Sequence, residues 1–203
     1  MDTPPLYRKG ESLQSLVGRS PNRLRELGGA RTRIDALEVK IGNLGLPSTM
    51  LGVLTRALSD LKVPQRERSP STFYLRPHVF EEIERLEDKD LPRYLYHRFR
   101  YDVFPVTKEL DGYPPCVQIE PTSICNFRCV FCFQTDPLLT LRKHGHAGQM
   151  SLDLFKKIVD QIEGHVEFVT MASRGEPLLT KNIEQMLAYA SGKFLGLKMN
   201  TNA

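Results

Sequence analysis

The sequence predicts an α/β protein, with a parallel sheet covered by helices in the C-terminal part of the chain and a mainly helical extension before it. Short apolar runs alternate with amphipathic helical patterns from residue 114 onward. A polar motif stands where each expected strand ends. Such alternation indicates a parallel sheet, because a helix has to carry the chain back before the next strand can run in the same direction.

Hydrophobic periodicity gives the expected elements. In the C-terminal part the order is strand 117–119, helix 152–163, strand 166–171, helix 182–189 and strand 194–199. Ser151 is a suitable N-cap for the first of these helices, and Gly164 is a suitable stop. In the N-terminal part we expect helices at 48–61, 77–88 and 91–101, whereas the apolar groups before them are broken by Gly and Pro.

Composition and charge narrow the class of protein. The chain has 203 residues, of which 40% are hydrophobic and 26% charged. No apolar run approaches the roughly 18 residues of a membrane span, and residues 1–10 contain no apolar core of a secretion signal. The net charge is +4, with acidic residues interleaved among the basic ones, which is typical of solvated helix faces. We therefore expect a cytoplasmic protein without a membrane or nucleic-acid partner.

The cysteines are the first candidates for chemistry. Cys125, Cys129 and Cys132 form a C-x3-C-x2-C pattern just after the first expected strand. Thiols stay reduced in the cytoplasm, so clustered cysteines indicate a metal site rather than disulfides. Three thiolates on one loop suit a cubane iron–sulfur cluster and leave one of its irons open for reaction. Cys116 precedes the strand, and we expect it to pack as a small buried side chain rather than as a fourth ligand.

Zinc is the alternative metal for this loop. A closed structural zinc site takes four ligands, usually as two separated pairs, and no second pair of cysteines follows Cys132. His144 or His146 could complete a set with the three cysteines, although the spacing matches no common zinc finger. A zinc-binding interaction module therefore stays open as an alternative function.

Other polar motifs end the second and third expected strands. Residues 173–177, Ser-Arg-Gly-Glu-Pro, follow the second strand, and residues 200–202, Asn-Thr-Asn, follow the third. The carboxyl ends of parallel strands lie at one edge of a sheet, where ligands bind in α/β proteins. The cysteine loop and these two motifs should therefore converge.

The segment 117–132 resembles the cluster loop of the radical S-adenosylmethionine (radical SAM) superfamily, which uses this cysteine spacing with an aromatic residue, here Phe131, before the last cysteine. Glu120-Pro-Thr and Gly175-Glu-Pro-Leu-Leu are most similar to its SPASM/twitch-type branch. The resemblance implies the N-terminal half of a parallel (β/α)6 partial TIM-like barrel. Members of that branch often modify peptides or take part in cofactor and cell-surface biosynthesis.

The turn at 173–177 resembles the Gly-Gly-Glu-Pro segment of this family, although Gly-Glu-Pro is also an ordinary strand-to-helix turn. The resemblance implies that Ser173, Gly175 and Glu176 bind the amino group of S-adenosylmethionine (SAM). Arg174 replaces the first glycine. Its cationic side chain must therefore point away from the ammonium group or bind another anion.

The resemblance also implies a mechanism. The three cysteines of the loop would hold a [4Fe–4S] cluster, and one electron passed to SAM would yield a 5′-deoxyadenosyl radical that abstracts hydrogen from an unidentified substrate. Phe131 would lie near the adenine, and the charge of Arg128 would raise the reduction potential of the cluster. An electron donor of the flavodoxin or ferredoxin type is expected as a partner. No side chain is assigned as a catalytic acid, base or nucleophile.

Three segments are expected: an N-terminal extension of unknown role at 1–71, a helical segment at 72–113 that packs on the barrel, and the radical SAM core at 114–203. The core holds only three strands, whereas a full eight-stranded barrel takes about 250 residues. We therefore expect a fragment of a longer protein, truncated after the third strand. A catalytically inert fragment is the second alternative function.

Overall fold

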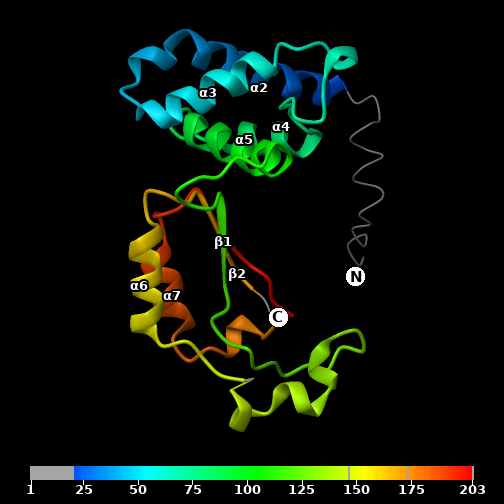
Figure 1. Cartoon of the computed structure of the whole chain (residues 1–203), viewed down its shortest axis with the longest axis vertical. Coiled ribbons are helices and arrows are strands. Elements are labelled where there is room, and N and C mark those ends of the chain that lie inside the picture. Colours follow the sequence, from blue (N-terminus) through cyan, green and yellow to red (C-terminus); the bar gives the residue numbers. More distant parts are fainter. Residues whose placement is uncertain (1–20, 146, 173, 203) are drawn as a thin grey trace, which may run out of the picture. The chain divides into compact units, whose positions relative to one another are not determined.

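The chain folds into two compact units with a boundary after Lys108. A computed structural model (Figure 1) describes residues 21–145, 147–172 and 174–202. The first unit is helical, and the second combines a sheet with helices. No helix in these described ranges is long and apolar enough to cross a membrane.

The first unit contains four α-helices among the described residues. These are α2 (Pro21–Lys40), α3 (Ser48–Asp60), α4 (Pro77–Arg85) and α5 (Leu91–Thr107). Helix α3 packs against α5 and α2 packs against α4, as Figure 1 shows. A small core forms where α3 and α5 meet, and it contains Ala57, Phe73, Phe99 and Val103. The helices expected at 48–61, 77–88 and 91–101 are therefore confirmed, with ends shifted by a few residues.

A single arginine joins α2 to the end of α4. The guanidinium of Arg33 donates hydrogen bonds to the carbonyl oxygens of Ile83 at 2.5 Å and Leu86 at 2.7 Å, and its Nε contacts Asp88 at 2.8 Å. Carbonyls at a helix end lack partners within the helix, and a cation there also complements the helix dipole. Arg33 thus closes the end of α4 from a neighbouring helix.

The second unit contains a three-stranded parallel sheet. Its elements are β1 (Cys116–Ile119), α6 (Leu152–Ile162), β2 (Phe168–Met171), α7 (Ile183–Ala190) and β3 (Gly196–Met199). The strands lie in the order β1-β2-β3, and every pairing is parallel. The predicted α/β class and element order are confirmed. The described residues show three strands, so the six-stranded barrel stays a prediction.

Helices α6 and α7 lie side by side along the sheet (Figure 1). Helix α6 begins at Ser151, whose Oγ accepts a hydrogen bond from the backbone N–H of Leu154. The turn after this helix contains Gly164, which adopts a φ of 78° that suits glycine. The core between helices and strands is apolar, and its fully buried residues include Phe155, Val159, Val169, Met171 and Met186.

The described helices of the expected segments 1–71 and 72–113 all lie in the first unit. The described helices of the 72–113 segment, α4 and α5, lie in the unit that ends at Lys108, together with α2 and α3. Their packing on the barrel stays a prediction. The extension at 1–71 is described from residue 21, where it consists mainly of α2 and α3.

We expect Phe155→Ala to destabilise the α/β unit by about 3–5 kcal/mol, because it removes a fully buried ring and leaves a cavity. Leu154→Ala is the matched control. Leu154 is the neighbour of Phe155 in the chain and is 48% exposed, so its replacement should destabilise the unit by less than about 0.5 kcal/mol. Urea unfolding followed by circular dichroism measures both variants. Equal losses would contradict the assignment of Phe155 to the core.

Candidate functional site

Three loops meet at the carboxyl edge of the sheet. The register places Ile119, Met171 and Met199, the last residues of the three strands, side by side. Hydrogen bonds continue past the strand ends, from the N–H of Ala172 to the carbonyl of Ile119 at 3.1 Å and from the N–H of Asn200 to the carbonyl of Met171 at 3.3 Å. The predicted convergence of the three motifs is confirmed for the residues that the structure describes.

The cysteine loop turns back on itself around its first cysteine. The N–H of Phe127 donates to Cys125 Sγ at 3.4 Å, and the N–H of Cys132 donates to the carbonyl of Cys129 at 2.8 Å. The guanidinium of Arg128 binds the carbonyl oxygens of Cys125 at 2.9 Å and Phe127 at 2.8 Å. This contact holds a positive charge within the loop, beside Cys125.

The donor set fits an iron–sulfur cluster. All three cysteines of the loop are free and partly exposed, and Cys125 and Arg128 line a hollow of about 210 Å³. Within the described ranges no group of three or more His, Cys, Asp or Glu side chains could hold a metal ion. That criterion describes ligands that meet around a single ion. In a cubane cluster each thiolate binds a different iron, so the ligand sulfur atoms lie around the cluster and need not meet at one point.

The other metal-binding candidates weighed from the sequence are Cys116, His144 and His146. Cys116 is exposed, so the expectation that it packs as a buried side chain was wrong. It is the first residue of β1, at the end of the strand opposite to the cysteine loop, and it pairs with Phe168 of β2. His144 is exposed, and His146 lies outside the described residues.

The turn after β2 is fastened to the start of the cysteine loop. The N–H of Glu176 donates to the carbonyl of Ile124 at 2.9 Å. Gly175 packs so closely that a Cβ at this position would overlap the carbonyl oxygen of Thr122. A side chain there would force the two segments apart. Gly175 is therefore required by the close approach of two backbones, and its contact with SAM stays a prediction.

A buried glutamine makes a second connection between these segments. Gln134 is 3% exposed, and its Nε2 donates to the carbonyl oxygens of Ser123 at 2.9 Å and Arg174 at 2.5 Å. Buried amides need such partners, because an unsatisfied donor in the interior costs free energy. Sequence reasoning missed Gln134. Its position two residues after Cys132 is the only signal that could have drawn attention to it.

Arg174 binds an anion within its own chain. Its guanidinium contacts Glu120, with Nη2 at 2.7 Å from Oε1 and Nε at 3.0 Å from Oε2, and its backbone N–H also donates to Oε2 at 3.2 Å. This two-pronged geometry is the one that a guanidinium makes best with a carboxylate. Of the two possibilities left open by the sequence, the described residues show the second: the side chain binds another anion.

The carboxylate of Glu176 is buried, with the residue 4% exposed. Its Oε1 accepts from the backbone N–H of Leu178 at 3.0 Å and from the hydroxyl of Thr201 at 2.6 Å, while Oε2 accepts from the backbone N–H of Asn202 at 2.7 Å. Burial raises the pKa of this carboxyl, but the hydrogen bonds from Asn202, Thr201 and Leu178 outweigh it, and the pKa lies below its ordinary value. Glu176 thus joins the second loop to the third.

Phe131 and Ser173 are the two other SAM contacts predicted from the sequence. Phe131 is 90% exposed, so its ring is open to a ligand, and its place beside adenine stays a prediction. Ser173 lies outside the described residues. Sequence reasoning also gave no role to Asn202, whose side-chain Nδ2 lies 3.6 Å from Cys125 Sγ and 3.2 Å from Asn126 Oδ1. The sequence marked it only as part of the motif at 200–202 and gave no sign of its contact with Cys125.

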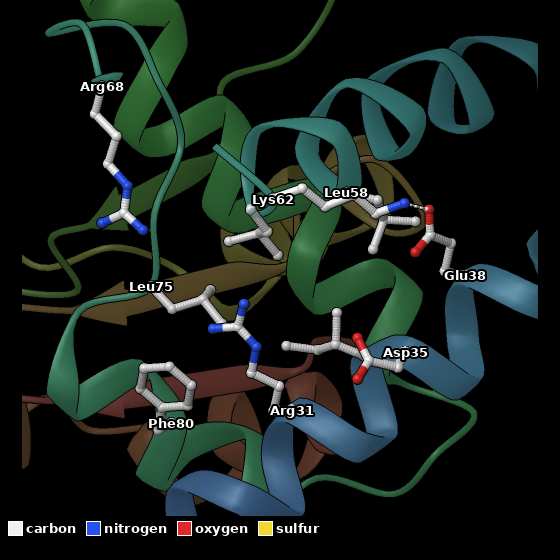
Figure 2. A pocket seen from close by; sticks show the side chains of 10 residues that line it. Arg31, Asp35, Glu38, Leu58, Lys62, Arg68, Leu75 and Phe80 are labelled. Carbon is white, nitrogen blue, oxygen red and sulfur yellow. Dashed lines mark hydrogen bonds and ion pairs between the residues drawn. The ribbon is translucent and has the colours of Figure 1, made fainter. Parts of the chain in front are cut away.

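A separate hollow of about 70 Å³ lies within the helical unit (Figure 2). Arg31 and Arg68 line it from different segments, together with the apolar side chains of Leu75 and Phe80. Lys62 is paired with Glu38 at 2.5 Å. Because charges of both signs line this hollow, it favours no single class of ligand, and the carboxyl edge of the sheet is the stronger candidate site.

We expect Glu176 to make folding depend on pH. Its pKa is lower in the folded protein than its ordinary value of 4.5, so its stabilising effect is complete above about pH 4.5 and is lost as the pH falls through the lowered pKa. Thermal melts of the wild-type chain and of Glu176→Gln should therefore differ most near neutral pH and converge as the pH falls below the lowered pKa of Glu176. Glu184→Gln, on the exposed side of α7, is the control and should follow the wild type throughout. A difference for Glu176→Gln that does not change with pH would contradict this assignment.

The sequence profile of the Radical SAM superfamily matches residues 119–203. The chain is similar to proteins named mycofactocin maturase MftC: it is 29% identical over 93 residues to that of Mycobacterium tuberculosis strain H37Rv and 28% identical over 89 residues to that of Mycolicibacterium smegmatis. Each match covers 44% of this chain and 21% of the relative, so the chain spans about a fifth of the length of these proteins. No solved structure gives a significant match.

The matched segment begins at Ile119, the last residue of β1, and runs through both later strands. It therefore contains the cysteine loop, the turn after β2 and the loop after β3, which the structure brings together at one edge. Residues 119–203 of this chain therefore match the Radical SAM superfamily, whose members use a [4Fe–4S] cluster and S-adenosylmethionine.

Proposed function

We propose that this chain carries the cluster-binding part of a radical SAM enzyme that abstracts hydrogen from a substrate still to be identified. One observation supports this function above the others. The loop with three cysteines follows β1 at the carboxyl edge of a parallel sheet, and Gly175 and Glu176 fasten the next loop directly against it. Ligands of α/β proteins bind at this edge.

In this proposal Cys125, Cys129 and Cys132 would hold the cluster, and SAM would bind beside it. The chemistry that the bound cofactors supply is the one-electron cleavage of the SAM sulfonium, which yields methionine and the 5′-deoxyadenosyl radical that takes a hydrogen atom from the substrate. The task of the protein is to hold SAM, keep water away and orient the reacting groups.

The turn after β2 would receive the amino group of SAM. An ammonium offers only donors, so it needs acceptors such as backbone carbonyls or a carboxylate. Both oxygens of Glu176 already accept hydrogen bonds from the chain. We therefore assign Glu176 mainly to holding the turn in place, with the backbone carbonyls of Ser173 and Gly175 as the acceptors, since that of Arg174 already accepts from Gln134. Arg174 does not interfere, because Glu120 binds its guanidinium.

Two residues of the cysteine loop have supporting roles in the proposal. The exposed ring of Phe131 would lie against the adenine. Arg128 would stabilise the reduced, more negative cluster, because its guanidinium is held on the carbonyls of Cys125 and Phe127. No catalytic acid or base is needed among the described residues, since the cofactors carry the bond-breaking chemistry.

The finer assignments belong to the same proposal. The sheet would be the first half of a (β/α)6 partial barrel of the SPASM/twitch-type branch, in a cytoplasmic protein served by a flavodoxin- or ferredoxin-type electron donor. The name of the relatives, mycofactocin maturase, favours the maturation of a precursor over a cell-surface sugar pathway. A match to about a fifth of these relatives supports the class of chemistry and leaves the substrate itself to experiment.

We expect Cys125→Ala, Cys129→Ala and Cys132→Ala each to lose most of the bound iron and acid-labile sulfide after anaerobic reconstitution, because each removes one of three ligands. Cys116→Ala should retain both, since Cys116 begins β1 at the opposite end of the strand. Iron and sulfide assays with visible absorption measure this. A colourless wild-type chain that binds zinc instead would establish the alternative interaction module, and loss of the cluster in Cys116→Ala would overturn the ligand assignment.

We expect the reconstituted chain to form 5′-deoxyadenosine and methionine when it is incubated with SAM and a strong reductant without oxygen. The chain holds the cysteine loop and the turn after β2, which are the parts that the proposal assigns to this step. Liquid chromatography quantifies both products, and Cys129→Ala is the control that should form neither. A wild-type chain that holds the cluster but gives no 5′-deoxyadenosine would be a catalytically inert fragment.

A further inference from the structure

The side chain of Asn202 lies against the first cysteine of the loop. Its Nδ2 donates to Cys125 Sγ at 3.6 Å and to Asn126 Oδ1 at 3.2 Å. A side-chain amide carries two N–H groups, so it can make both hydrogen bonds at once. Asn202 comes from the loop after β3 and reaches across the carboxyl edge to the loop after β1.

Asn202 is held in this position from behind. Its backbone N–H donates to Oε2 of Glu176 at 2.7 Å, and the hydroxyl of the preceding Thr201 donates to Oε1 at 2.6 Å. Glu176 is itself buried and fastened to Ile124 through its own backbone N–H. A rigid set of contacts therefore aims the amide, which is what a residue that orients a metal ligand requires.

Cys125 differs from the other two cysteines in the hydrogen bonds that its sulfur accepts. Within the ranges that the structure describes, N–H groups of Phe127 and Asn202 donate to Cys125 Sγ, and no recorded donor reaches the sulfur of Cys129 or Cys132. Hydrogen bonds to ligand sulfur are one of the factors that set the reduction potential of an iron–sulfur cluster. They stabilise the reduced form more than the oxidised form, because the reduced form carries more negative charge on sulfur.

We propose that Asn202 is a positioning residue that raises the reduction potential of the cluster through its hydrogen bond to Cys125 Sγ. This inference rests on the proposed function, because it requires the cysteine loop to hold a cluster. The redox step is the transfer of one electron from an external flavodoxin- or ferredoxin-type donor to the cluster, and no proton or leaving group is involved. Through Asn202, the position of the loop after β3 would therefore affect the reduction potential of the cluster.

The test compares two substitutions with a matched control. Asn202→Ala removes the donor, and Asn202→Asp replaces it with a negative charge next to the sulfur. Asn202 is exposed, so neither change leaves a buried cavity. Asn200→Ala is the control, because Asn200 belongs to the same loop and its exposed side chain makes no recorded contact with a cysteine among the described residues.

We expect the wild-type chain, both Asn202 variants and the control to take up equal amounts of iron and sulfide. Redox titration followed by electron paramagnetic resonance should then give a lower midpoint potential for Asn202→Ala than for the wild type, and the lowest for Asn202→Asp. Asn200→Ala should equal the wild type. A purely structural role for Asn202 would change cluster content or thermal stability without this ordering of potentials.

A second measurement needs no variant to fold. Pulsed electron paramagnetic resonance of the reduced wild-type cluster, with the asparagine side chains labelled with ¹⁵N, should detect coupling to an amide nitrogen. An unlabelled sample is one control, and the labelled Asn202→Ala variant is the other, because the side chain of Asn126 also lies beside Cys125 Sγ. Absence of this coupling, or equal potentials for the wild type and both Asn202 variants, would overturn the role of Asn202 and leave the proposed function intact. A wild-type chain that takes up no cluster would instead overturn the proposed function.

Discussion

The buried carboxylate of Glu176 is the contact on which the arrangement of this site depends. It accepts hydrogen bonds from its own turn at Leu178 and from the loop after β3 at Thr201 and Asn202. Without it, the loops after β2 and β3 would lose the hydrogen bonds that Thr201 and Asn202 donate to Glu176. A charged acceptor in a buried position makes strong hydrogen bonds, so these loops have one defined arrangement.

Charge is balanced locally around this centre. Glu120, at the end of β1, neutralises Arg174 in the turn after β2, which leaves the backbone of that turn available for a ligand. Arg128 instead directs its charge onto carbonyl oxygens of the cysteine loop. The two arginines therefore have opposite consequences: one is cancelled by a carboxylate, and the other adds positive potential beside Cys125.

The sequence was sufficient for the α/β class, the order of the elements and the convergence of three loops, because these follow from periodicity and from the geometry of parallel strands. Helix α2 was missed, since Gly28 and Gly29 interrupt its apolar pattern and its helical state depends on packing against α4. The roles of Gln134 and Asn202 could not be predicted either. Both rest on contacts between residues far apart in the chain, which no local pattern encodes.

The hydrogen bonds of Gln134 bear on how the proposed site would respond to oxygen. Oxygen destroys exposed iron–sulfur clusters. A ligand loop that is held only by its cluster would then lose its structure. Here one amide still ties Ser123 on the entry side of the loop to Arg174 on the neighbouring strand connection. If the loop holds the proposed cluster, these two hydrogen bonds would still join its entry to the turn after β2 once the cluster is lost, and a new cluster would be built on a loop that is already anchored there.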